Sequence, residues 1–199
     1  MDERNELSRV SQKYLTRYRE ITENMICKMN GADFTDSISQ NFINQMIPHH
    51  EAEIEMSQNL LRYTTNLPLQ NLADKIISGQ SRDVEKMKSM LKKCSAFKNP
   101  KQEFFYYIQQ NRSIMQNMFL SMKNAKRLNC INESFILEMI PHHEGAVQMA
   151  QNALKYRLCP ELTPLLRGII KTQTEEICEM KKIYKELTEY TNPPRQSIK

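Results

Sequence analysis

The chain contains four histidines, and all of them lie in two copies of one segment, Met-Ile-Pro-His-His-Glu, at residues 46–51 and 139–144. Neutral imidazole binds zinc, copper, nickel and iron, whereas a methionine thioether selects copper(I). Methionines flank one histidine of each pair at helical spacing, Met46 and Met56 beside His49, and Met139 and Met149 beside His142. This combination of ligands predicts a transition-metal site, with copper as the first choice and zinc as the second.

A second set of polar residues interrupts an apolar helical stripe later in each half of the chain. In both stripes a glutamine is followed by a carboxylate and then by a methionine, each about one helical turn further on: Gln80, Asp83 and Met87, then Gln173, Glu176 and Met180. A buried polar group without a partner costs about 1–3 kcal/mol, so these side chains should meet other polar groups. The obvious partners are the histidines, which extends the candidate site to His49, His50, His142, His143, the four flanking methionines and these six residues.

Other interpretations of the histidines stay open. They could be structural, hydrogen-bonded across a helical bundle to Gln80, Asp83, Gln173 and Glu176 in a scaffold or interaction protein. A di-metal oxidoreductase is a weaker alternative, because neither copy has the Glu-x-x-His motif of di-iron bundles. The sequence shows no nucleophile–base constellation and no glycine-rich phosphate loop, so enzyme activity is the less favoured interpretation.

The elements that carry these residues are predicted to be helices, arranged as a tandem duplication. A shift of 93 residues aligns residues 42–51 with 135–144, and the register continues without a gap through the pairs Met56 and Met149, Tyr63 and Tyr156, and Gln80 and Gln173. Apolar residues at spacings of three and four predict helices over about residues 4–29, 36–64 and 68–93, and again over 101–127, 132–157 and 161–189. Both histidines of each pair face inward on the second helix of their copy.

The predicted fold class is all-α. The two histidine helices and the two Gln-x-x-acid helices are expected to form a ferritin-like four-helix bundle, with two additional helices outside it. Copy one spans residues 1–97, copy two spans 98–190, and residues 191–199 form a disordered tail. The copies are expected to share one bundle, with two separate three-helix units as the alternative. Pro48 and Pro141 lie inside the histidine helices, where each should kink the helix or end one helix and start the next.

Composition limits the class of protein. No run of eighteen apolar residues is present, which excludes a membrane span, and the charged N-terminus does not resemble an export signal, so a cytoplasmic location is expected. The net charge of +5 is scattered, which argues against nucleic-acid binding. The five cysteines include no Cys-x-x-Cys pair and are expected to be reduced thiols. Whether the chain forms a homo-oligomer stays open.

The histidine segments, together with Gln80–Met87 and Gln173–Met180, closely resemble the domain-of-unknown-function 305 family. The resemblance covers the second and third predicted helices of both copies. It implies a ferritin-like bundle and suggests metal handling, since some members of the family are associated with copper. Copy one departs from the family pattern, because Glu51-Ala52-Glu53 stands where copy two has Glu144-Gly145-Ala146, and Asp83 replaces the usual glutamate.

Overall fold

The computed structural model describes residues 7–191, and within them it contains six α-helices and no strand. The helices are α1 (Arg9–Asn30), α2 (Ile38–Leu61), α3 (Leu67–Ser95), α4 (Lys101–Lys123), α5 (Ile131–Ala153) and α6 (Leu162–Thr191). The predicted all-α class is therefore confirmed. Of the tail predicted over residues 191–199, Thr191 is the last residue of α6, and the remainder lies outside the described residues.

Polar side chains in the connecting segments fix where the first three helices begin. The Oγ of Ser8 accepts a hydrogen bond from the Ser11 amide, and the Oγ of Ser37 accepts one from the Gln40 amide. Asn66 caps α3 in the same way. The apolar pattern predicts a start near residue 4 for the first helix, but α1 begins after the Ser8 cap, because this side chain satisfies an amide that the helix itself leaves unpaired.

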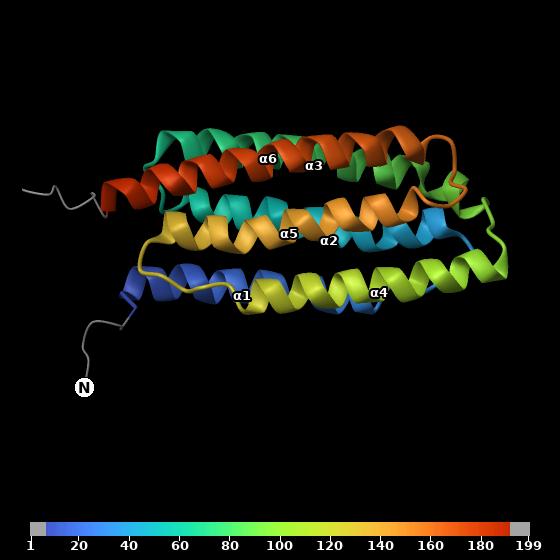
Figure 1. Cartoon of the computed structure of the whole chain (residues 1–199), viewed down its shortest axis with the longest axis horizontal. Helices are drawn as coiled ribbons and strands as arrows, with labels where there is room; N and C mark the ends of the chain where they lie inside the picture. Colours follow the sequence, from blue (N-terminus) through green and yellow to red (C-terminus); the bar gives the residue numbers. More distant parts are fainter. Residues whose placement is uncertain (1–6, 192–199) are drawn as a thin grey trace, which may run out of the picture.

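The helices stack as three layers of two, α1 with α4, α2 with α5, and α3 with α6 (Figure 1). α2 packs against α1 and α3, α5 packs against α4 and α6, and the two halves of the chain meet through α2–α5 and α3–α6. The middle layer, α2 and α5, is thus covered on both sides. Helices α2, α3, α5 and α6 make a closed ring of contacts. The finer ferritin-like classification and the boundaries between the copies stay predictions.

Pro48 and Pro141 do not divide the helices that contain them. α2 and α5 run unbroken through these positions, so one helix does not end there for another to begin. A proline removes one backbone bond of a helix, but the packing of α2 and α5 on both sides holds the remaining turns together. The histidines that follow each proline therefore project from a continuous helix.

Most residues of the inward stripes are buried, but the polar stripe of α3 departs from its prediction. Val84 is buried, whereas Asp83, which was predicted on the inward stripe, is only partly buried. The inward position predicted for Asp83 is wrong: its carboxylate pairs with Lys86 at 3.2 Å, where both groups keep contact with water. Water and the ammonium group of Lys86 stabilise the negative charge of Asp83. A buried carboxylate would lose its contact with water, which costs free energy. The matching Glu176 in α6 is buried, as predicted.

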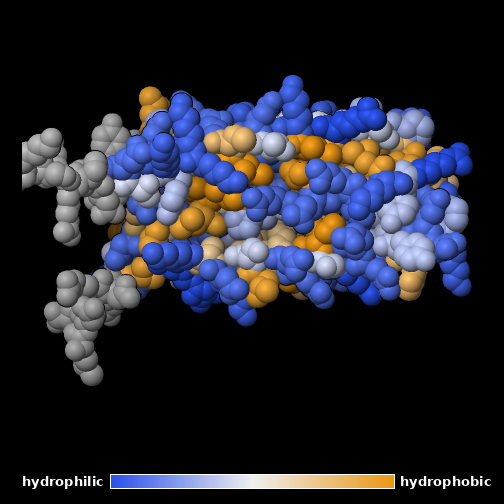
Figure 2. Space-filling view, in the orientation of Figure 1, coloured by the Kyte–Doolittle hydropathy of each residue, from blue (hydrophilic) through white to orange (hydrophobic). Residues whose placement is uncertain are grey.

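Polar side chains cover most of the face drawn in Figure 2, with apolar groups visible between the rows of polar ones. The larger apolar surface of each helix is directed at its neighbours in the core. None of the described helices combines the length and the apolar character that crossing a membrane requires.

Candidate metal centre

The four histidines meet at the contact between α2 and α5. His49 and His50 come from α2, His142 and His143 come from α5, and the solvent-exposed fraction of each is 0%. The centroids of the His49 and His142 rings are 3.8 Å apart, at an angle of 43°. The two His-His segments therefore form one cluster, although they are far apart in the sequence.

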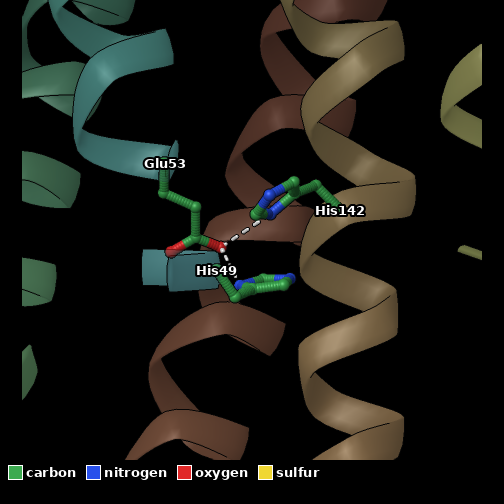
Figure 3. A group of neighbouring side chains, drawn as sticks. All are labelled: His49, Glu53 and His142. Carbon is green, nitrogen blue, oxygen red and sulfur yellow. Dashed lines mark hydrogen bonds and ion pairs between the residues drawn. The ribbon is translucent and has the colours of Figure 1, made fainter. Parts of the chain in front are cut away.

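Glu53 lies at the centre of this cluster, one turn after His49 on α2. Its Oε1 atom is 3.0 Å from Nδ1 of His142, 3.4 Å from Nδ1 of His143 and 3.7 Å from Nδ1 of His49, and its Oε2 atom is 3.9 Å from Nδ1 of His50. Figure 3 shows the carboxyl group pointing towards the rings of His49 and His142. One fully buried carboxyl group thus lies within 4.0 Å of all four imidazoles.

Three side chains from other helices complete the cluster. Gln173 on α6 donates hydrogen bonds to both oxygens of the central carboxyl group, at 3.1 and 3.2 Å. Glu176 Oε2 lies 3.1 Å from Nε2 of His143, and the Sδ atom of Met25 on α1 lies 3.1 Å from Nε2 of His142. Each imidazole of α5 is therefore held at Nε2 by a residue of another helix, which fixes the orientation of the ring.

Several nitrogen atoms of the cluster have no hydrogen-bond partner among the described residues. They are both ring nitrogens of His49, both of His50, and Nδ1 of His143. An unpaired buried polar group costs about 1–3 kcal/mol. Purely structural histidines would be expected to have every nitrogen bonded, so this pattern fits metal ligands better than a structural role.

Burial keeps three of the imidazoles neutral. It lowers the pKa of His50 to about 3, and it lowers the pKa values of His49 and His142 well below their usual range. His143 differs: burial acts against its charge, but the carboxyl groups on α2 and α6 outweigh burial and raise its pKa. A neutral imidazole has a free lone pair, which is the form that binds a metal.

Burial acts in the opposite direction on the central carboxyl group, raising the pKa of Glu53 to about 8. The positive charge of His143 acts against this effect of burial, so the proton of Glu53 is coupled to the charge of its neighbours. A cation between the rings would favour the carboxylate, because a nearby positive charge stabilises the ionised form. Binding of a metal and release of the Glu53 proton are thus coupled.

His49, Glu53 and His142 meet a geometric requirement for a metal site. One ligand atom from each lies within 4.8 Å of the others, and all three side chains are buried. Two imidazole nitrogens and a carboxylate oxygen suit zinc, iron and copper(II), while the Met25 thioether beside His142 adds a soft ligand that favours copper(I). The residues present therefore fit copper in either oxidation state.

A groove of about 420 Å³ between α3 and α6 leads from the surface towards this cluster. Gln80, Asp83 and Gln173 are among the residues that line it. Gln173 also donates to Glu53, so this side chain contacts both the groove and the central carboxyl group.

The structure brings together some of the residues predicted for the site and leaves others apart. The four histidines, Gln173 and Glu176 lie in the cluster. Asp83 does not, since it faces the groove and Lys86. Gln80 and the six methionines predicted as ligands are buried: Met46, Met56, Met87, Met139, Met149 and Met180.

Glu53 and Met25 are the members of the cluster that sequence reasoning leaves out of the ligand set. A signal for Glu53 exists, because a carboxylate stands on the inward stripe where the other copy has Ala146. Met25 gives no comparable signal, since a methionine on an inward helical stripe is usually core filler.

Comparisons with known proteins point to one family. The profile of the family described as domain of unknown function (DUF305) matches residues 39–184. Among solved structures, CopM in the apo form aligns with a TM-score of 0.55 and 30% identity, covering 74% of this chain and 96% of that chain. CopM in the Cu(II)-bound form gives 0.56 and 28%, covering 75% and 97%. A DUF305 fragment from Deinococcus radiodurans shares the fold, with a TM-score of 0.56, 23% identity and coverage of 75% and 96%. No curated protein matches the chain.

Proposed function

Because the chain belongs to the DUF305 family, we propose that it is a copper-binding protein whose ion is held between its two His-His segments. CopM, to which most of the chain is similar, is known in Cu(II)-bound and Ag-bound forms. This likeness supports copper as the first choice of ion, and zinc is the second.

The observation that carries the proposal is the convergence of His49, Glu53 and His142 in a fully buried cluster with unpaired imidazole nitrogens. Burying four imidazoles and a carboxyl group is costly unless they gain partners. An ion would use the free lone pairs and the carboxylate at once, and its binding energy would offset that cost.

The burial of the cluster favours sequestering over catalysis. An ion at this position would be separated from bulk water by α1, α3, α4 and α6, which pack on the two histidine helices. A reaction on a large substrate needs open space beside the metal, and the histidines are not among the residues that line the groove between α3 and α6. The cytoplasmic location and the homo-oligomer stay predictions.

The test is a titration of the purified, reduced protein with copper(I), copper(II) and zinc in the presence of a competing chelator. The double variant with His49→Ala and His142→Ala should lose one bound copper ion per chain, because two of three ligands are removed. Glu55→Gln is the matched control, since this carboxylate lies on the same helix as His49, pairs with Arg17 and is outside the cluster. It should bind copper as the unmodified protein does.

Unchanged copper stoichiometry after both histidine substitutions would show that the cluster is not the site. Tighter binding of zinc than of copper(I) or copper(II) would show that the cluster is a metal site but that zinc is its preferred ion.

A further inference from the structure

An ion that binds between the histidines has to pass the helices that bury them, and one groove is linked to the cluster by hydrogen bonds. This is the groove between α3 and α6, which Gln173 lines. The side chain of Gln173 is 1% exposed, and its Nε2 atom donates to both oxygens of Glu53, at 3.1 and 3.2 Å. Gln173 therefore belongs to the groove and to the cluster at once.

A second groove, of about 430 Å³, lies between α1 and α4, in the opposite outer layer of the helical stack (Figure 1). Glu138 is among the residues that line it, and its carboxyl group accepts a hydrogen bond from Tyr14. In the described part of the chain, no residue lining this second groove has a hydrogen bond or ion pair to Glu53 or to a histidine. The groove between α3 and α6 is therefore the better candidate for an ion route.

Two glycines inside helices leave space in the groove between α3 and α6. Gly79 on α3 and Gly168 on α6 both line it, and a Cβ atom added at either position would meet no atom within 4 Å. Close packing therefore does not require glycine at either position. Glycine also destabilises the interior of a helix relative to alanine. The two helices thus keep this space open at a cost in their own stability.

Two amide oxygens of residues that line the groove are buried without a partner. They are Oε1 of Gln80 and Oε1 of Gln173, and neither accepts a hydrogen bond from the described residues. A buried polar atom without a partner calls for an explanation, and amide oxygens are among the oxygen ligands that proteins offer to cations. Both oxygens are thus available to an ion that moves inward from the groove.

We propose that the groove between α3 and α6 is the route by which copper enters and leaves the histidine centre, and that Gln173 closes its inner end. In the closed state the Gln173 amide donates to Glu53. When an ion passes, the side chain turns away, its two hydrogen bonds break, and Oε1 contacts the ion. The amide then donates to Glu53 again, behind the bound ion. This inference rests on the proposed function, since it requires an ion in the histidine centre.

The experiment measures how fast copper(I) leaves the loaded full chain when an excess of a chromogenic copper(I) chelator is added, by anaerobic stopped-flow absorbance. Gly79→Leu fills the groove and should slow release by about 10-fold or more, as obstructing a gate does. Its equilibrium affinity, from chelator competition, should stay unchanged, because a route alters loading and release by the same factor. Ser78→Leu is the matched control, since Ser78 is exposed on α3 and outside the groove. It should release copper as the unmodified protein does.

Gly168→Leu narrows the same groove from α6, so it tests the route again if Gly79→Leu does not fold. Release from both leucine variants at the rate of Ser78→Leu would overturn the route. Copper bound at the histidine centre with such unchanged rates would leave the proposed function intact, whereas absence of copper from this centre would overturn both proposals.

Gln173→Ala tests the inner end of the groove. It should raise the rate constants of loading and of release together, because no side chain then has to turn away. A residue that only supports Glu53 would stabilise the bound state, so its loss would speed release and leave loading unchanged. Loading is measured by mixing the metal-free protein with weakly chelated copper(I). Unchanged loading by Gln173→Ala would show that Gln173 does not close the route.

Discussion

Positions 93 residues apart make the same contacts near the C-terminal ends of α2 and α5, and different contacts around the histidines. In the first half of the chain, the Asn59 amide donates to the Tyr14 carbonyl at 3.1 Å, and the rings of Tyr14 and Tyr63 meet edge to face at 6.0 Å. The second half repeats both contacts, at 3.2 Å and 5.9 Å, with Asn152, Tyr107 and Tyr156. These contacts join α1 to α2 and α4 to α5, so they fix how the first two helices pack in each half.

Around the histidines the halves differ. Gln45, Ala52 and Glu53 of α2 correspond to Glu138, Gly145 and Ala146 of α5. Glu53 lies within 4.0 Å of imidazoles from both helices. A glutamate at position 146 would bring a second carboxyl group into the same buried space, where two like charges repel each other. A centre shared by two equivalent helices therefore takes its carboxyl group from one of them only.

The largest effect is expected from removing this difference with Glu53→Ala, which gives both helices the same residue. Copper affinity of the histidine centre should fall by more than about 100-fold, because even residues that only orient a ligand typically contribute 10–100-fold. Chelator competition measures the change. The control is Glu55→Ala, an exposed position on the same helix that pairs with Arg17, and it should leave the affinity unchanged. Copper binding that survives Glu53→Ala would mean that the imidazoles suffice without a carboxylate.

The second difference concerns Glu138, which is buried and accepts a hydrogen bond from Tyr14 at 3.1 Å. Burial raises the pKa of its carboxyl group to about 8, above the ordinary value of 4.5. The folded state therefore holds this proton more tightly than the unfolded chain does. Its contribution to stability is fully present below pH 4.5 and is lost as the pH rises towards 8.

Glu138→Gln, which copies Gln45, should remove this dependence. Relative to the unmodified protein, the free energy of unfolding of the variant should rise by about 3–4 kcal/mol between pH 5 and pH 8, because a pKa difference of one unit corresponds to about 1.4 kcal/mol. Urea denaturation at several pH values measures the difference between the two proteins and cancels the titration of other groups. The reverse variant, Gln45→Glu, should acquire a similar dependence. Parallel stability curves for Glu138→Gln and the unmodified protein would show that Glu138 is already ionised at neutral pH.

A smaller effect is expected at Gly145, which corresponds to Ala52. A Cβ atom at Gly145 would overlap Sδ and Cγ of Met118 and would lie 2.9 Å from its Cβ, so the methionine would have to move. Gly145→Ala should lower the free energy of unfolding by about 1 kcal/mol, since the cost of overpacking exceeds the gain in helix propensity. At Gly168 an added Cβ meets no atom within 4 Å, so Gly168→Ala is the matched control and should stabilise α6. A more stable Gly145→Ala protein would mean that Met118 moves at no cost.

The sequence predicts features that are encoded within a single helix better than features that depend on how several helices pack. Apolar periodicity predicts all six helices, and the paired motifs predict that His49, His50, His142 and His143 face inward, because both signals reside within one helix. The side from which Glu53 and Met25 approach His142 depends on how α1, α2 and α5 cross, which no single helix encodes. Asp83 fails as an inward residue for a related reason: Lys86, one turn further along α3, pairs with its carboxylate where both groups reach water.

The smallest effects concern the two tyrosines that otherwise match. The Tyr14 hydroxyl donates to Glu138, whereas the Tyr107 hydroxyl is buried and has no hydrogen-bond partner among the described residues. In the second half Asn111 donates to Gln45 at 2.7 Å, which leaves Tyr107 without the corresponding acceptor. Tyr14→Phe should lower the free energy of unfolding by about 1 kcal/mol, because the bond to a buried carboxyl group is lost. Tyr107→Phe should cost nothing measurable or stabilise slightly, since it removes an unpaired hydroxyl and keeps the ring contact with Tyr156. Thermal or urea unfolding of the two variants at pH 6 separates these outcomes, and equal losses would show that the two halves bury their tyrosines in equivalent surroundings.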